Sequence, residues 1–176
     1  RMAMTISALI DSALEDANTM ALRMKKMDLT RLVQGVVNAN QAPARKKVQE
    51  IIYNCKTECH VYGDERKITE VVDNVVSNAI KFSGANKKIE VTIRMEDQKA
   101  VLTISDQGPG LSKDDMKNLF RRFTSLSAEP TGGESSTGLG LFLSKEIVVA
   151  HNGKIYAESE GKDKGTSFII ELPVAE

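Results

Sequence analysis

The sequence contains no tryptophan, only two cysteines and two histidines, and equal numbers of basic and acidic residues, 24 of each. Two cysteines cannot supply a disulfide-stapled scaffold, and the balanced charge gives no basic footprint for nucleic acid or an anionic membrane surface. No apolar run approaches the roughly 20 residues of a membrane-spanning helix, and no signal peptide is evident. The length of 176 residues suits one sizeable α/β domain plus an extra element.

The two cysteines, Cys55 and Cys59, lie next to His60, which raises the possibility of a metal site. No other cysteine and no nearby paired histidine completes the four ligands that structural zinc requires. We therefore expect two reduced thiols on strands of a cytosolic domain.

Apolar residues recur every three or four positions from Met2 to Met27, which predicts a helix with an apolar seam. The seam needs a partner, which could be another chain in a dimer or the rest of one compact domain. Asp28-Leu29-Thr30 then indicates a break followed by the N-cap of a new helix.

Downstream, periodicity predicts alternating helices and strands. A helix begins at Leu29 and is limited or restarted by Pro43, and Asp64 caps a long helix. Further helices are predicted over 113–123 and 141–150, and strands over 48–53, 60–62, 88–95, 100–105, 155–158 and 167–172. Such a set predicts an α+β fold, a two-layer sandwich whose mixed sheet is mostly antiparallel.

The most informative segment is the helical stretch Asp73–Ser83, which places Asn74, Asn78 and Lys81 on one side. Residues three and four positions apart are neighbours on a helix, so these polar side chains converge, while the other side is apolar. Two amide oxygens and an ammonium suit a hydrated divalent cation that carries phosphate oxygens. A solvated polar face has the same pattern, so the segment alone leaves both interpretations open.

Two glycine clusters follow. Asp106–Leu111 comes directly after a predicted strand, and Ser135–Leu141 comes directly before an amphipathic helix. Glycine lets the backbone approach a ligand closely, and a glycine-rich turn that opens a helix offers free N–H groups to phosphate. Either cluster alone is typical of a turn, whereas the ordered set of three motifs predicts a nucleotide site.

In this order and spacing the motifs resemble the catalytic ATP-binding domain of sensor histidine kinases, whose Bergerat-type fold is shared with gyrase, Hsp90 and MutL. The resemblance covers residues 29–173. Its asparagine box matches Asn74, Asn78, Lys81 and Phe82, and its first glycine box matches Asp106, Gly108 and Gly110. Its phenylalanine box matches Phe120 and Phe123, its second glycine box Gly138 and Gly140, and its last glycine motif resembles Gly165–Phe168.

The resemblance implies that Asn78 is the principal Mg²⁺ ligand with Asn74 beside it, and that Asn78 and Lys81 are the catalytic residues. It also implies that Asp106 accepts a hydrogen bond from the adenine amino group, although Asp before Gly is also a common turn cap. The other implied ATP-binding residues are Phe82, Gly108, Gly110, Leu111, Phe123, Thr137, Gly138, Leu139, Gly140, Leu141 and Thr166. Phe120 and Phe123 read more simply as core anchors.

Residues 124–137 are polar and lie between the phenylalanine box and the second glycine box. In the resemblance this segment is a lid over ATP, whereas on its own it is typical of a surface loop. Many family members carry an arginine shortly after the phenylalanine box, but here Thr124 and Ser125 follow. Arg121 or Arg122 is therefore expected to bring positive charge to the γ-phosphate.

Asn74 distinguishes branches of the resemblance, because gyrase, Hsp90 and MutL have a glutamate there that activates water. Asparagine cannot act as a general base, and the adjacent Asp73 points about 100° away on a helix. ATP is therefore expected to pass its phosphate to a protein. Neither His60, on a predicted strand, nor His151, in a helix stop with Asn152 and Gly153, is placed to accept it.

The resemblance implies that residues 1–27 end a dimerisation and phosphoacceptor hairpin and that residues 28–176 form the catalytic domain, using ATP and Mg²⁺. The implied partners are the phosphoacceptor hairpin of the parent kinase and a response-regulator receiver domain. We expect a cytoplasmic domain without direct membrane contact, in a homodimeric parent that can itself be membrane-anchored. A non-catalytic ATP-binding interaction module and a conformational ATPase stay open as alternatives.

Overall fold

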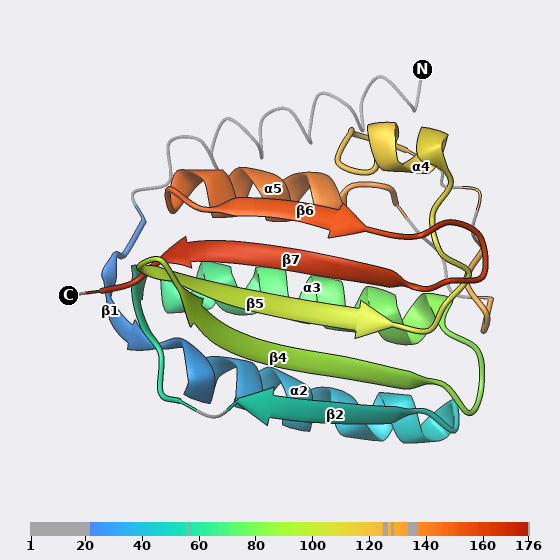
Figure 1. Ribbon diagram of the computed structural model, residues 1–176, viewed down its shortest axis with the longest axis horizontal. Helices are drawn as coiled ribbons and strands as arrows, with labels where there is room; N and C mark the ends of the chain where they lie inside the picture. Colours follow the sequence, from blue (N-terminus) through green and yellow to red (C-terminus); the bar gives the residue numbers. More distant parts are fainter. Residues whose placement is uncertain (1–21, 56, 125–126, 128, 134–136, 176) are drawn as a thin grey trace, which may run out of the picture.

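The computed structural model describes residues 22–55, 57–124, 127, 129–133 and 137–175. In chain order its elements are β1 (Lys25–Asp28), α2 (Leu29–Lys46), β2 (Glu50–Cys55), β3 (His60–Gly63), α3 (Glu65–Phe82), β4 (Lys88–Glu96), β5 (Lys99–Asp106), α4 (Lys113–Asn118), α5 (Gly140–Ala150), β6 (Lys154–Glu158) and β7 (Thr166–Pro173). Figure 1 shows this arrangement along the chain.

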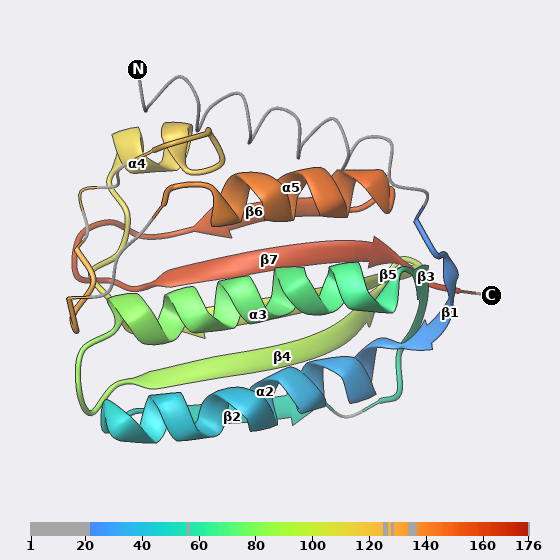
Figure 2. The ribbon, with the colours of Figure 1, turned by 180° about the vertical axis from the view of Figure 1, so that it is seen from behind.

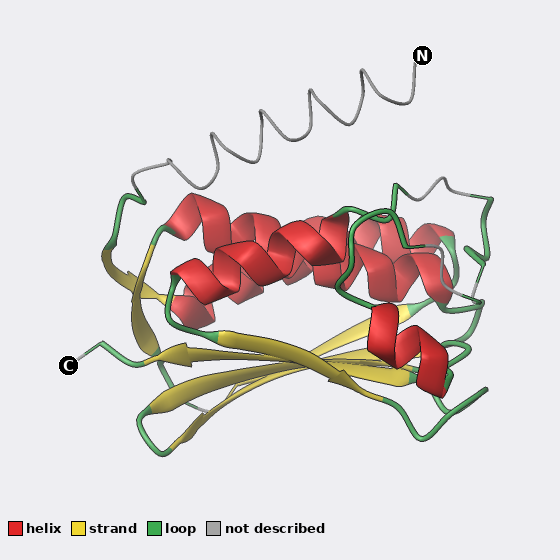
Figure 3. Ribbon diagram, turned by 90° about the horizontal axis from the view of Figure 1, so that it is seen from above, coloured by secondary structure: helices red, strands yellow, loops and turns green. Residues whose placement is uncertain are grey.

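In the described part of the chain, the main sheet has the strand order β2-β4-β5-β7-β6. β2 pairs with β4 in parallel, and the other neighbours pair antiparallel. Helices α2, α3 and α5 lie across one face (Figure 2), and Figure 3 shows the helices and the strands as two layers. The predicted α+β two-layer sandwich is confirmed, and β1 and β3 add a small antiparallel pair at one end.

The core lies between these layers. In β4, Ile89, Val91 and Ile93 are buried at alternate positions because successive side chains of a strand point to opposite faces. Helix α3 buries its predicted apolar stripe, which consists of Ile68, Val71, Val72, Val75, Val76, Ala79 and Ile80. Asn74, Asn78 and Lys81 are consequently left at the margins of this stripe, where they are only partly buried.

Both predicted helix caps are present. The Asp28 carboxylate accepts the Arg31 N–H at 3.0 Å, and the Asp64 carboxylate accepts the Lys67 N–H at 3.2 Å. Caps of this kind typically contribute about 1 kcal/mol each. His151, only 1% exposed, accepts the Asp64 backbone N–H at 2.9 Å, so the end of α5 is tied to the start of α3.

Two predictions near the start of the chain are wrong. Most of the predicted helix 2–27 lies outside the described residues, but Lys25–Asp28 form a strand because they pair with β3, and Met27 enters the core. Helix α2 also continues through Pro43. Both Pro43 and Ala39, whose carbonyl loses its helical donor, are exposed, so water can replace that hydrogen bond.

Helix α4 ends at Asn118, five residues before the predicted end at Phe123. The chain turns there, because the Arg121 N–H donates to the Asn118 carbonyl at 2.9 Å. Phe123 has a φ of 56°, a left-handed conformation that a right-handed helix excludes. The predicted strand at Val48 likewise begins only at Glu50, since Val48 has the same φ of 56°.

Candidate functional site

A small cavity opens between α3, the end of β5, the start of α5 and β7. It is lined by Asn78, Phe82, Asp106, Pro109, Leu111, Leu119, Leu141, Thr166 and Phe168. The structure thus brings together residues from the asparagine box, both glycine boxes and the last glycine motif. Mostly apolar walls with a few polar groups are typical of a site for a flat organic ring.

Asp106 is the acidic group of this cavity and stands where β5 ends. Its Oδ1 accepts the backbone N–H groups of Gly108 at 2.8 Å and Thr166 at 3.3 Å. Burial raises the pKa of this carboxyl group, and the two N–H donors oppose that rise. Among the described residues, no donor binds Oδ2, so this oxygen is available to a ligand in the cavity.

The two asparagines of α3 have different surroundings. Asn74 donates its amide N–H to the Ser144 hydroxyl of α5 at 2.9 Å, and a side chain at Gly140 would collide with its amide oxygen. Asn78, one turn later, lines the cavity, and within the described residues its amide makes no hydrogen bond. Of the two expected metal-binding residues, Asn78 is therefore the one that faces the cavity, while Asn74 holds α5 against α3 through Ser144.

Two other polar residues of α3, Lys81 and Asp73, do not line the cavity. Lys81 is not among the lining residues, and its Nζ lies 5.6 Å from the centre of the Phe82 ring. Asp73 accepts a 2.8 Å hydrogen bond from Asn40 of α2, on a side of α3 that does not line the cavity. The predicted divergence of Asp73 from Asn74 is confirmed.

The second glycine box lies directly before α5. Gly138 has a φ of 67°, and a Cβ there would lie 2.8 Å from the backbone N of Thr124, so only glycine fits without strain. No side chain caps α5 at Leu139, which leaves its first N–H groups to other acceptors. Thr137 is exposed and outside the lining, and Ser135 and Ser136 lie outside the described residues.

The phenylalanine box behaves only partly as predicted. Phe120 packs against the core, but Phe123 is 53% exposed and is not a core anchor, because its left-handed backbone turns it outward. The Arg122 guanidinium lies 4.7 Å from the centre of the Phe142 ring, beside the first turn of α5. Of the two arginines expected near phosphate, Arg122 is the one in contact with the helix that follows the second glycine box.

A family model described as "Histidine kinase-, DNA gyrase B-, and HSP90-like ATPase" matches residues 63–176. The chain belongs to this ATPase family. Its sequence is 30% identical over 179 residues to the sensor histidine kinase WalK of Bacillus subtilis, covering 100% of this chain and 29% of WalK. The chain therefore spans less than a third of that relative.

Solved structures agree with the ATPase family assignment. The mycobacterial sensor histidine kinase MprB superposes with a TM-score of 0.74 at 27% identity, covering 86% of this chain and 97% of that one. Full-length ShkA in complex with AMPPNP gives a TM-score of 0.77 at 25% identity, covering 89% of this chain and 32% of ShkA. The resemblance to sensor histidine kinase catalytic domains is confirmed.

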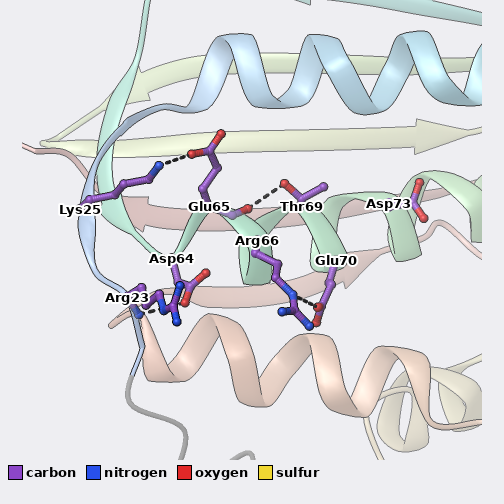
Figure 4. Close-up of a pocket in the computed structure, with 8 residues that line it drawn as sticks. All are labelled: Arg23, Lys25, Asp64, Glu65, Arg66, Thr69, Glu70 and Asp73. Carbon is purple, nitrogen blue, oxygen red and sulfur yellow. Dashed lines mark hydrogen bonds and ion pairs between the residues drawn. The ribbon is translucent and has the colours of Figure 1, made fainter.

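A larger hollow, about 640 Å³, lies at the first half of α3 and shares no lining residue with the small cavity. Figure 4 shows the charged side chains around it, including the ion pairs Lys25–Glu65 and Arg66–Glu70. Its described lining residues are all charged or polar, so it lacks the apolar walls of the small cavity. Exposed pairs of this kind typically contribute less than about 1 kcal/mol each.

Several residues in and around the small cavity were not among the predicted site residues. Pro109, Leu119 and Phe168 complete the apolar wall, and Ser144 holds Asn74. Ser144 stands four residues after Gly140, so helical spacing places it on the same face as the glycine box. None of the described helices is both long enough and apolar enough to cross a membrane.

Proposed function

We propose that this chain is the ATP-binding catalytic domain of a sensor histidine kinase. In this proposal it transfers the γ-phosphoryl group of Mg·ATP to a histidine on a separate helical hairpin. The observation that carries the proposal is the cavity itself, which is lined by both Asp106 and Asn78. Among the described residues, no donor binds Oδ2 of Asp106 and the Asn78 amide makes no hydrogen bond. Membership of the ATPase family and the likeness to WalK and MprB support the same class.

Asp106 is the adenine acceptor in this proposal. Gly108 and Thr166 hold one carboxylate oxygen, so the other is fixed in direction and accepts the adenine amino N–H. Phe82, Leu111 and Leu141 of the lining provide apolar surface for the faces of the base. A base without that donor leaves a half-buried carboxylate unpaired, which gives specificity for adenine.

The residues present fit a magnesium ion that shares its coordination with phosphate. Bound Mg²⁺ neutralises phosphate charge, and it prefers few protein ligands and several waters. Asn78 is the side chain that would hold it, with Asn74 behind it maintaining the position of α5. Within the described residues, no cluster of three His, Cys, Asp or Glu side chains offers an alternative metal site.

The phosphate groups belong at the start of α5. The backbone around Gly138, Leu139 and Gly140 leads into a helix whose first N–H groups lack a side-chain cap, and such a terminus favours anions. We propose that Lys81, in the last turn of α3, and Arg122, stacked on Phe142, supply positive charge there. These groups would position the phosphate groups of ATP and neutralise their negative charge.

Transfer to a histidine, rather than to water, follows from the same residues. Asn74 is neutral and bonded to Ser144, while Asp73 is turned toward α2, so neither activates a water in the cavity. An imidazole nitrogen of the acceptor forms a bond to the γ-phosphorus, the bond to the bridging oxygen of ADP breaks, and ADP leaves. His60 lies on β3 and His151 is buried, so we propose that the acceptor lies on the parent kinase's hairpin.

We further propose that the phosphoryl group then passes to an aspartate of a response-regulator receiver domain, and that the domain works in the cytoplasm. These partners follow from the sensor histidine kinase class of the relatives. A homodimeric parent is part of the same proposal.

Affinity for ATP should fall as the pH is lowered. Because the pKa of Asp106 is raised, its carboxylate acquires a proton at a higher pH than an ordinary aspartate does, and the protonated oxygen no longer accepts from adenine. The free energy of unfolding changes with pH in the opposite direction. It rises as the pH is lowered, because a raised carboxyl pKa means that the folded state binds the proton more tightly than the unfolded state does. Calorimetric titration with Mg·ATP from pH 7.5 down to about 4.5 tests this, and an Asp106→Asn variant should lose the dependence.

Equilibrium binding tests the proposal as a whole. Titration of the chain with ATP in the presence of Mg²⁺ should give saturable one-to-one binding, and GTP should bind far more weakly. A chain that binds neither nucleotide, or both equally, contradicts the proposed function. The non-catalytic alternative predicts the same binding, so it is separated from the kinase by transfer of label to a histidine.

A further inference from the structure

The lid segment (residues 124–137) is fastened to α4 at one described residue, Ser127. The Ser127 N–H donates to Oδ1 of Asp115 at 2.9 Å, and its hydroxyl donates to Oδ2 at 2.5 Å. Asp115 is only 8% exposed. A buried carboxylate that receives two donors from one residue forms a strong, directional contact.

Asp115 also caps its own helix. Together with Ser112 it forms a capping box, and Ser112 donates both its N–H, at 3.0 Å, and its hydroxyl, at 2.6 Å, to Oδ2. Burial raises the pKa of Asp115, but the hydrogen bonds from Ser112 and Ser127 outweigh it and hold the pKa well below its usual range. The carboxylate therefore stays charged at neutral pH and joins the lid segment to a fixed helix start.

A second described residue, Thr131, fastens the lid segment to the other side. Its N–H donates to the Lys81 carbonyl at 3.0 Å, and its hydroxyl donates to the Ser83 carbonyl at 2.9 Å. The Lys47 ammonium, from the end of α2, donates to the Thr131 hydroxyl at 2.7 Å and to the Lys81 carbonyl at 3.1 Å. Carbonyls at a helix C-terminus lack helical donors, so these contacts satisfy the end of α3.

Each fastening point lies next to a residue that lines the cavity. Leu119, in the lining, follows Asp115 by one helical turn, and Phe82, also in the lining, lies between Lys81 and Ser83. Ser127 and Thr131 are therefore both bonded to groups next to the lining of the cavity. We propose that Asp115 is a positioning residue that latches the lid segment through Ser127, with Thr131 as the second anchor, and thereby slows nucleotide release. This inference rests on the proposed function.

Stopped-flow release of a fluorescent ATP analogue, in Mg²⁺, tests the latch. Ser127→Ala removes one charge-assisted hydrogen bond but leaves the helix cap, and release should quicken by about tenfold. Ser127→Thr keeps the hydroxyl and should release at close to the wild-type rate. Asp114→Asn is the matched control, because Asp114 is exposed and contacts only Lys117 and Asn118 among the described residues.

A second comparison separates the latch from helix capping. Ser112→Ala weakens the cap and should lower thermal stability without reproducing the tenfold faster release. Asp115→Asn should add little to the release rate of Ser127→Ala, because both changes break one contact. Release from Ser127→Ala at the wild-type rate overturns the latch, whereas a wild-type chain that does not bind the analogue overturns the proposed function on which it rests.

Discussion

Asp106→Asn should lower the affinity for Mg·ATP by about 100-fold, since a hydrogen bond to a charged group contributes about 1.5–3 kcal/mol. The asparagine oxygen still accepts the N–H groups of Gly108 and Thr166, so the loop keeps its shape. Its amide nitrogen, however, then points a donor at the adenine amino group, which is also a donor. The loss is therefore confined to recognition of the base, and calorimetric titration measures it.

Asp97→Asn is the control. Asp97 lies in the exposed turn between β4 and β5, and this substitution removes the same charge away from the cavity. Its ATP affinity should equal that of the wild type. An Asp106→Asn variant that unfolds at the wild-type temperature and binds ATP within about twofold of wild type would contradict the adenine assignment.

Asn78→Ala should lower the rate of phosphoryl transfer on the order of 100- to 1000-fold, the range found when one group that stabilises transition-state charge is removed. The amide of Asn78 has no other task within the described residues, so the fold should tolerate its loss. Removing Mg²⁺ should weaken nucleotide binding by the wild type and should have little effect on the variant. Titrations with and without the metal measure this difference.

Asn74→Ala provides the contrast. Asn74 donates a hydrogen bond to Ser144 and so holds α5 against α3. Its loss should lower the free energy of unfolding by about 1–2 kcal/mol. Its binding of ATP should remain dependent on Mg²⁺. Equal loss of metal dependence in the two variants would show that both asparagines are ligands, and an Asn78→Ala variant with wild-type dependence would contradict the assignment to Asn78.

The main lines of the fold followed from periodicity in the sequence. The apolar stripe of α3 is buried as predicted, and the strands 88–95 and 100–105 were displaced by no more than one residue at either end. Asp28 and Asp64 cap the helices that they were expected to cap. These features depend on residues that are close together in the chain, so they can be predicted from the sequence.

The features that the sequence did not predict are set by tertiary contacts. Lys25–Met27 were predicted to be helical, but pairing with β3 makes them part of a strand, and helix propensity is too weak to prevent that. Asn74 and Asn78 have equivalent patterns, and only the packing of α5 against α3 shows that one is engaged and the other presented. The Ser-x-x-Asp spacing at Ser112 and Asp115 does signal a capping box, but not the bond from Ser127.

Phosphoryl transfer to histidine is tested by following the label from γ-labelled ATP. The chain is incubated with Mg²⁺ and the proposed histidine-bearing hairpin of the parent kinase, and both phosphohistidine and free phosphate are measured over time. Transfer to histidine should give acid-labile, alkali-stable label on the hairpin and little release of free phosphate. Normal ATP binding with no label on the hairpin, or with the label released only as free phosphate, would contradict it.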